Sequence, residues 1–272
     1  MRIGRPRLEE REGRLAHRVP VESSLGPDEL WFSVESRNSD LVTDRSEAAL
    51  LGLLLPAMQR REEVRVEGQI SGRFLHNLDG PFQFLLNSEF PWLERVPIRA
   101  EEIVPPPPRA PGVATGFSAG IDSFSVLADH HYGNPPPGHR LTHLLYNNVG
   151  SHGAEGNDLF AARYERLGPA VERIGLPFVA VDSNLMSFYD EKLSFKVTYT
   201  LRNAVVALLL QGGIGRSFHA AGTVLGKRSR YRPLRDIAFL DPILLPMIST
   251  EALDAVSAGG HYTRVEKTLQ VA

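Results

Sequence analysis

The feature that most constrains the fold is a regular alternation of short apolar runs and longer amphipathic runs after residue 112. The short runs have the length of buried strands, and the longer runs have the spacing of helices. Strands that alternate with helices imply right-handed crossovers and a parallel sheet covered on both faces. We therefore expect an α/β fold with a parallel five-stranded sheet and helices on both faces. The five candidate strands are residues 112–117, 142–150, 176–183, 216–223 and 237–244.

A run of four prolines at residues 105–108 predicts a boundary ahead of this pattern. Such a run cannot continue a helix or a central strand, and it favours an extended spacer. We therefore divide the chain into a small N-terminal α+β domain at 1–104, a linker at 105–111 and the main domain at 112–272.

The N-terminal part shows secondary structure but no chemical motif. Residues 28–36 and 62–71 alternate like strands, and residues 46–61 have the start and end signals of a helix. Because no motif indicates chemistry, we expect an accessory role for this part. Substrate recognition and a homodimer contact are the two alternatives.

Composition excludes several classes of site and partner. The 272 residues include no cysteine, which excludes disulfides, thiolate zinc sites and cysteine chemistry. The formal net charge of −2 gives no general footprint for nucleic acid. The first 18 residues lack the apolar core of a signal peptide, and the longest apolar run, at 49–58, is too short to span a bilayer. We therefore expect a cytoplasmic protein without a membrane or nucleic-acid partner.

The turn after the first candidate strand has the sequence Ser-Ala-Gly-Ile-Asp-Ser at residues 118–123. The helix that follows presents unpaired N–H groups and the positive end of its dipole at this turn. Ser118 and Ser123 add hydroxyl donors, and the small residues Ala119 and Gly120 let a ligand approach the backbone closely. The turn therefore favours an anion, most simply a phosphate group. It is neither a Walker A loop nor a Gly-x-Gly-x-x-Gly fingerprint.

This hexapeptide resembles the Ser-Gly-Gly-x-Asp-Ser PP-loop of the ATP pyrophosphatases, which have an adenine nucleotide alpha-hydrolase-like fold. The chain is most similar to the amide- and nitrile-forming branch, which includes asparagine synthetase, GMP and NAD synthetases and 7-cyano-7-deazaguanine synthase. Arg202 and Asn203 match the Arg-Asn helix of the deazaguanine synthases. Gly222, Thr223 and Lys227 are similar to a Gly-Thr-x-x-Lys-Ser stretch of NAD synthetase.

The resemblance implies ATP and Mg²⁺ as cofactors and cleavage of ATP between the α and β phosphates. It implies that a carboxylate or carbonyl oxygen of the acceptor attacks the α phosphorus, pyrophosphate leaves, and a nitrogen nucleophile then displaces AMP. Charge develops on the leaving pyrophosphate, so donors and cations are needed there. The site residues that it implies fall into three groups. They are Asp122 (also the Mg²⁺ ligand), Lys227 and Arg202 as catalytic residues; Ser118, Ala119, Gly120, Ile121, Asp122, Ser123, Gly222 and Thr223 around the phosphates; and the backbone of Leu145 and Tyr146 against adenine.

Three points stay open at this stage. Ala119 stands where the family has glycine, so either its methyl group narrows the approach of the phosphate or the position has right-handed or extended geometry. The basic residues of 227–235 form either a solvated loop or a loop that closes over the phosphates. The acceptor is not identified, and a non-catalytic adenine-nucleotide-binding module is the alternative to an AMP-forming ligase.

Overall fold

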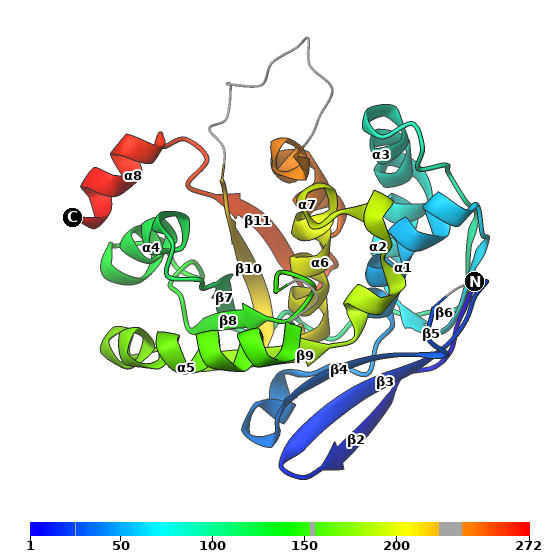
Figure 1. Ribbon diagram of the computed structural model, residues 1–272, viewed down its shortest axis with the longest axis horizontal. Coiled ribbons are helices and arrows are strands. Elements are labelled where there is room, and N and C mark those ends of the chain that lie inside the picture. Colours follow the sequence, from blue (N-terminus) through cyan, green and yellow to red (C-terminus); the bar gives the residue numbers. More distant parts are fainter. Residues whose placement is uncertain (25, 153–155, 223–235) are drawn as a thin grey trace.

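The computed structural model describes residues 1–24, 26–152, 156–222 and 236–272. These residues form one sheet of 11 strands with helices on both faces (Figure 1). The strands follow the order β11-β10-β7-β8-β9-β4-β3-β1-β5-β6, and β2 pairs with β3 beside this path. Their bounds are β1 (Arg2–Ile3), β2 (Arg7–Arg11), β3 (Arg14–Glu22), β4 (Glu29–Glu35), β5 (Val64–Ile70), β6 (Ile98–Ile103), β7 (Gly112–Gly116), β8 (His143–Asn147), β9 (Phe178–Ser183), β10 (Ile214–Ala220) and β11 (Asp254–Ala258).

The helices pack in two layers on this sheet (Figure 1). In the described ranges the α-helices are α1 (Glu47–Arg60), α2 (Gly72–Asn77), α3 (Gln83–Glu89), α4 (Ile121–Leu127), α5 (Gly156–Ile174), α6 (Phe195–Leu209), α7 (Asp241–Met247) and α8 (Arg264–Val271). The helices α4 and α5 cover one face of the parallel strands, and α1, α6 and α7 cover the other. None of these helices combines the length and the apolar character needed to cross a membrane.

The prediction of a parallel five-stranded sheet is wrong, because the sheet is mixed and has 11 strands in the described ranges. The strands β7 to β11 do run parallel to one another. The sheet continues past β9, since β4 pairs with it antiparallel, with Phe32 opposite Ser183 and Ser33 opposite Asp182. This pairing joins strands that are far apart in the sequence, so no local pattern indicates it.

The last parallel strand lies elsewhere than predicted. Residues 237–244 form a short 3₁₀ helix, η7 (Ile237–Leu240), and the start of α7. Asp236 accepts a hydrogen bond from the N–H of Ala238, and Pro242 lies in the first turn of α7. Both are helix-start signals, and they outweigh the apolar run that suggested a strand. The edge strand is β11 instead, paired parallel with β10.

Alternate residues of the parallel strands contribute to two separate cores. Leu144 of β8 packs in the smaller core under α4 and α5, and the next residue, Leu145, packs in the larger core with α1 and α6. This follows from the alternation of side chains along a strand. The helix α1 is buried along most of its length and packs against both β5 and α6. The larger core therefore runs through both halves of the sheet.

A buried carboxyl group joins the two halves. Glu47, the first residue of α1, is fully buried. Its Oε1 accepts hydrogen bonds from Arg45 Nε at 2.9 Å and from the backbone N–H of Ser71 at 2.8 Å. Its Oε2 accepts one from Gln211 Nε2 at 3.3 Å, and the Gln211 side chain accepts one from Thr250 Oγ1 at 3.0 Å. This network connects residues on both sides of the proline-rich stretch.

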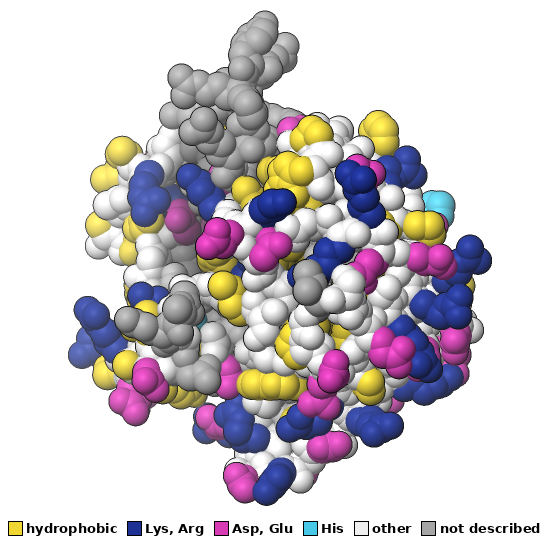
Figure 2. All heavy atoms as spheres, turned by 45° about the vertical axis from the view of Figure 1, so that its right-hand side comes forward, with side chains coloured by type: hydrophobic (Ala, Val, Ile, Leu, Met, Phe, Trp, Pro, Cys, Tyr) yellow, Lys and Arg dark blue, Asp and Glu magenta, His cyan; other side chains and the backbone are white. Residues whose placement is uncertain are grey.

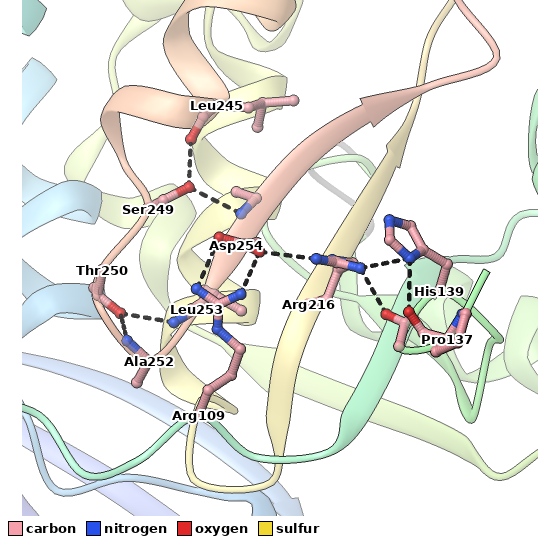
Figure 3. Close-up of polar contacts among 12 residues, drawn as sticks. Arg109, Pro137, His139, Arg216, Leu245, Ser249, Thr250, Ala252, Leu253 and Asp254 are labelled. Atoms are coloured by element: carbon pink, nitrogen blue, oxygen red, sulfur yellow. Dashed lines mark hydrogen bonds and ion pairs between the residues drawn. The ribbon is translucent and has the colours of Figure 1, made fainter.

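Ion pairs fix the amino ends of the last two strands (Figure 3). Asp254, the first residue of β11, pairs with Arg216 of β10 at 3.0 Å and with Arg109 of the proline-rich stretch at 2.5 Å. Arg216 also lies 2.9 Å from His139 Nδ1. Because a guanidinium only donates, this nitrogen is the acceptor. The cluster holds the sheet edge that lies away from the carboxyl ends of the strands.

The surface in Figure 2 carries both signs of charge interspersed, including the region of the N-terminal strands. Ion pairs of these strands include Arg2 with Glu22, Arg5 with Glu102, and Arg99 with Glu63. Each such exposed pair adds little stability, because solvent and salt screen the attraction.

Candidate functional site

The order of the parallel strands, β9-β8-β7-β10-β11, reverses direction between β7 and β10. In open α/β sheets, ligands bind at such a switch point, outside the carboxyl ends of the strands. Residues 117–120 leave β7 at this point and lead into α4. Ser118, Ala119 and Gly120 are exposed. The 118–123 loop therefore lies where the topology of the sheet favours a ligand.

The backbone of this loop has an unusual conformation at Ala119. Its φ is +54°, in the left-handed region. The suggestion of right-handed or extended geometry at Ala119 is therefore wrong, and the position has the geometry that glycine favours. Gly120 follows as the N-cap of α4 and supplies no side-chain hydrogen bond to it. Because glycine has no side chain, the N–H groups in the first turn of α4, beginning at the half-buried Ile121, receive no side-chain hydrogen bond from the N-cap position.

The two serines of the loop have different surroundings. Ser123 is buried, and its hydroxyl donates to the carbonyl oxygen of Gly120 at 2.8 Å. This bond stabilises the turn. Ser118 is exposed and lines the cavities on both sides of the loop. Of the two predicted hydroxyl donors, Ser118 is thus the one that faces open space.

A cation that sequence analysis missed lies beside the loop. Lys267 of α8 is only 3% exposed. Its Nζ donates to Asp122 Oδ1 at 2.7 Å and to the carbonyl oxygen of Ala221, which follows β10. Arg264, one turn earlier on α8, lies 3.7 Å from the other carboxylate oxygen of Asp122. The C-terminal helix therefore brings two positive charges to the predicted phosphate loop.

A cavity of about 280 Å³ opens between the carboxyl ends of β7, β8 and β10 and the helix α6. This volume is near the lower limit for sites that bind small molecules. Leu145 and Tyr146, which we predicted to face adenine, line it together with Phe117. Asn147 and Asn203 line it as well and are joined by a hydrogen bond of 2.9 Å. Aromatic and aliphatic walls with a few amide groups suit a planar heterocycle.

One wall of this cavity contains two titratable groups, the half-buried His219 and, behind it, the buried Asp241. His219 of β10 lines the cavity, and its Nε2 lies 3.8 Å from Asp241 Oδ2. Thr200 donates to Asp241 Oδ1 at 2.7 Å. Burial raises the pKa of Asp241 to about 7 and lowers the pKa of His219 to about 4. At neutral pH, His219 is therefore uncharged, and Asp241 is near the midpoint of its titration.

The remaining predicted residues lie in different places. Arg202 of α6 is 1% exposed, and its guanidinium lies 3.8 Å over the ring of Tyr189 and donates to the carbonyl oxygen of Leu193 at 2.6 Å. The guanidinium charge therefore interacts with buried protein groups, and Arg202 does not line the cavity beside Ser118. Gly222 is exposed directly after β10. Thr223, Lys227 and the rest of the basic segment 227–235 lie outside the described residues.

Asp122 is the predicted ligand of Mg²⁺, and its side chain is 28% exposed. In the described part of the chain, no group of three or more His, Cys, Asp or Glu side chains is placed to hold a metal ion. Magnesium is commonly held by one or two carboxylates together with the phosphates of a substrate. The donors at Asp122 therefore fit a magnesium ion that arrives with a nucleotide.

Comparisons of the chain with family models, with curated proteins and with solved structures find no match. The PP-loop resemblance therefore stays a prediction, based on the residues of the 118–123 loop. A fold alone does not define a function, so the function is inferred from the site.

Proposed function

We propose that the protein activates an acceptor substrate by adenylation, with cleavage of ATP between the α and β phosphates. The main support is the contact of the buried Lys267 with Asp122 at the 118–123 loop. Together with Arg264, Lys267 leaves a net positive charge beside Asp122, and such a charge favours a ligand of high negative charge. The pyrophosphate portion of ATP has such a charge. The lining of the adjoining cavity suits adenine.

These positions favour attack at the α phosphorus. With adenine in the cavity and the β and γ phosphates near Asp122 and Lys267, the α phosphorus is close to Ser118. An oxygen of the acceptor attacks this phosphorus, the bond to the bridging oxygen breaks, and pyrophosphate leaves with the electron pair. Lys267 and the amides of the loop stabilise the charge that develops on pyrophosphate.

The second half of the reaction releases AMP. A nitrogen nucleophile attacks the activated carbon of the acceptor, loses a proton and displaces AMP. When bound with the nucleotide, Mg²⁺ neutralises phosphate charge, with Asp122 as its ligand from the protein. The product is then an amide when the acceptor is a carboxylate, or an amidine when it is an amide-type carbonyl.

Labelled products test this proposal. The protein is incubated with ATP labelled at the α phosphate or, in a parallel sample, at the γ phosphate, together with Mg²⁺ and a cell extract that supplies acceptors, and the products are separated by chromatography. We expect AMP and pyrophosphate in equal amounts. A dominant yield of ADP and inorganic phosphate would exclude the proposed reaction.

Variants separate this activity from that of the extract. Asp122→Asn and Lys267→Met should each reduce AMP formation by roughly 10²–10³-fold, because each removes a charge at the reacting phosphates. Lys192, which is exposed in a short 3₁₀ helix, provides the control. Lys192→Met should retain full activity. Equal activity of all three variants would contradict the assignment.

A nucleotide-binding module without chemistry is the second candidate, and one observation favours it. Lys267 already neutralises the Asp122 carboxylate that Mg²⁺ would need. A simple binding module should bind α,β-methylene-ATP equally well with and without Mg²⁺, and it should form no AMP from ATP. Calorimetric titration in both conditions decides. A large gain in affinity with Mg²⁺ supports the enzyme, and equal affinity supports the module.

A further inference from the structure

A second cavity, of about 480 Å³, lies on the other side of the 118–123 loop, against α5. Arg163 and Arg166 line it from the helix, and Ser118 and Ala119 line it from the loop. The two arginines are three residues apart, so they lie on the same face of α5. We call this space the α5 cavity. It shares Ser118, Tyr146 and Ser151 with the cavity that suits adenine.

The arginines of the α5 cavity have no acidic partner among the residues that the structure describes. Within the residues that the structure describes, neither Arg163 nor Arg166 forms an ion pair or a hydrogen bond with another protein group. Glu165, which lies between them in the sequence, lines a different cavity on another side of α5. The α5 cavity therefore contains two positive charges that no described residue compensates, next to an exposed serine hydroxyl.

The only histidine that lines the described part of this cavity adds no charge. His152 is buried, with its Nε2 3.0 Å from the Tyr146 hydroxyl and its Nδ1 3.0 Å from Ser151 Oγ. Burial and the nearby charge of Arg163 lower the pKa of His152. The imidazole is therefore neutral at neutral pH and orders the polar groups at the base of the cavity. The guanidinium groups are left as the charged donors, and their planar fork geometry matches a carboxylate or a phosphate group.

The position of the α5 cavity indicates which ligand it takes. Lys267 and Arg264 of α8 lie at the Asp122 end of the loop. The helices α8 and α5 lie on opposite sides of α4 (Figure 1). In an in-line displacement, the attacking oxygen approaches from the side opposite the leaving group. With pyrophosphate near α8, the acceptor approaches Ser118 from the side of α5.

We infer that the α5 cavity binds an anionic group of the acceptor, a carboxylate or a phosphate, through Arg163 and Arg166. This inference rests on the proposed function, because it assigns the leaving pyrophosphate to the α8 side. It narrows the acceptor to a small molecule with a negative charge in addition to the group that is adenylated.

Calorimetry with two probe anions tests the inference. The protein is first saturated with α,β-methylene-ATP and Mg²⁺, and is then titrated with inorganic phosphate or with succinate. We expect one anion to bind to the wild-type protein. The double variant Arg163→Gln/Arg166→Gln should lose affinity for it by about tenfold or more, since two charge-assisted contacts are removed. Preference for succinate or for phosphate identifies the anionic group.

A matched control separates these contacts from general charge effects. Arg173 is exposed near the end of α5 and does not line the cavity. Arg173→Gln should bind the anion as the wild-type protein does. No anion binding by the wild-type protein, or an equal loss in the Arg173 variant, would overturn the inference.

The affinity for the nucleotide analogue makes the two proposals distinguishable. The double variant should bind α,β-methylene-ATP as well as the wild-type protein. A loss of that affinity would show that the arginines hold the phosphates of ATP, which overturns the inference but not the adenylation. If the wild-type protein does not bind the analogue but binds the anion through the two arginines, the proposed function fails and the anion site stands.

Discussion

Each half of the sheet buries a carboxyl group, and the two groups have very different surroundings. Glu47, at the junction with the N-terminal strands, accepts three hydrogen bonds that engage both of its oxygens. Asp241, behind the cavity at the parallel strands, accepts one from Thr200, and its Oδ2 has no hydrogen-bond partner among the described residues. Burial raises the pKa of both groups.

The difference in hydrogen bonding between Glu47 and Asp241 indicates a different role for each half of the sheet. A fully bonded buried network rigidifies a junction, and a buried polar atom without a partner needs a separate explanation. The unpartnered oxygen of Asp241 lies next to His219, which lines the cavity. We therefore regard the Glu47 network as a structural joint and the cavity wall as part of the site.

The largest effect is expected at the joint. Glu47→Gln leaves the buried guanidinium of Arg45 without its charge partner, and removal of one member of such a pair costs about 3–5 kcal/mol of unfolding free energy. Urea denaturation followed by circular dichroism measures the loss. Glu63→Gln, in the exposed pair with Arg99, is the control and should change stability by less than about 1 kcal/mol. Similar losses in the two variants would contradict the role of Glu47 as a joint.

The next effect concerns Asp241 and depends on pH. Its folded-state pKa of about 7 lies above the ordinary value of 3.8, so the folded protein holds a proton that the unfolded chain releases. This contribution to stability is complete below about pH 4 and is lost as the pH rises through 7. Asp241→Asn removes the dependence. At about pH 8 the variant should be more stable than the wild-type protein by on the order of 4 kcal/mol.

A series of denaturation curves from about pH 4 to 8 checks this result. The lowered pKa of His219 produces the opposite trend below about pH 6.5, and the part of this contribution that does not depend on its neighbour Asp241 cancels in the difference, because His219 is present in both proteins. If the difference between the two proteins stays constant with pH, Asp241 does not titrate in the way its burial implies.

The position of the 118–123 loop could be predicted from the sequence, but the groups around it could not. The turn at 118–123 has a local signal, and the structure confirms that it lies between a strand and a helix. Lys267 contacts Asp122 across 145 residues of chain, and no local pattern indicates which face of α8 packs against the loop. Arg202 matched a family motif, yet its side chain packs over Tyr189, a contact that depends on the tertiary fold.

The antiparallel half was missed for a related reason. The strand β3 alternates buried and less buried residues and follows a turn in which Glu12 and Gly13 both have positive φ. These are hairpin signals. The charged residues near the N-terminus made these signals hard to recognise in the sequence. Those charged residues lie on the exposed strand β2 and on the outer positions of β3. The strands β4 and β9 are far apart in the sequence, and neither segment alone indicates that they pair.

A third, intermediate effect tests a bond between the two halves. Pro56 lies inside α1 and has no N–H, so the Gly52 carbonyl lacks its usual helical donor. The hydroxyl of Tyr189 supplies one instead, at 2.7 Å, and burial raises the pKa of Tyr189 to about 12, which keeps it protonated. Tyr189→Phe should cost about 1–3 kcal/mol, since it leaves a buried carbonyl without a partner.

A double-mutant cycle sharpens this test. Pro56→Ala restores an N–H that can bond to Gly52, so Tyr189→Phe should cost less in the Pro56→Ala protein than in the wild-type protein. Thermal and urea denaturation of the four proteins give the coupling energy. A coupling energy of zero would show that the Tyr189 hydroxyl does not replace the missing helical bond.

The smallest effect is expected in the loop itself. Ala119 has a φ of +54°, which costs a residue with a side chain roughly 1–2 kcal/mol relative to glycine in the folded state. Glycine in turn loses more backbone entropy on folding, by roughly 0.5–1 kcal/mol. Ala119→Gly should therefore stabilise the protein by a net of about 0.5–1 kcal/mol and retain AMP formation.

Ala128 offers a matched comparison, because it follows α4 with a φ of −58° and ψ of −44°, in the right-handed region. Here glycine brings no relief of strain, so Ala128→Gly should destabilise the protein by about 0.5–1 kcal/mol. The two alanine-to-glycine variants should thus shift the denaturation midpoint in opposite directions. If both destabilise equally, Ala119 is not left-handed in solution. The loop amides would then point elsewhere, and the case for a phosphate at Ser118 would lose its basis in the backbone.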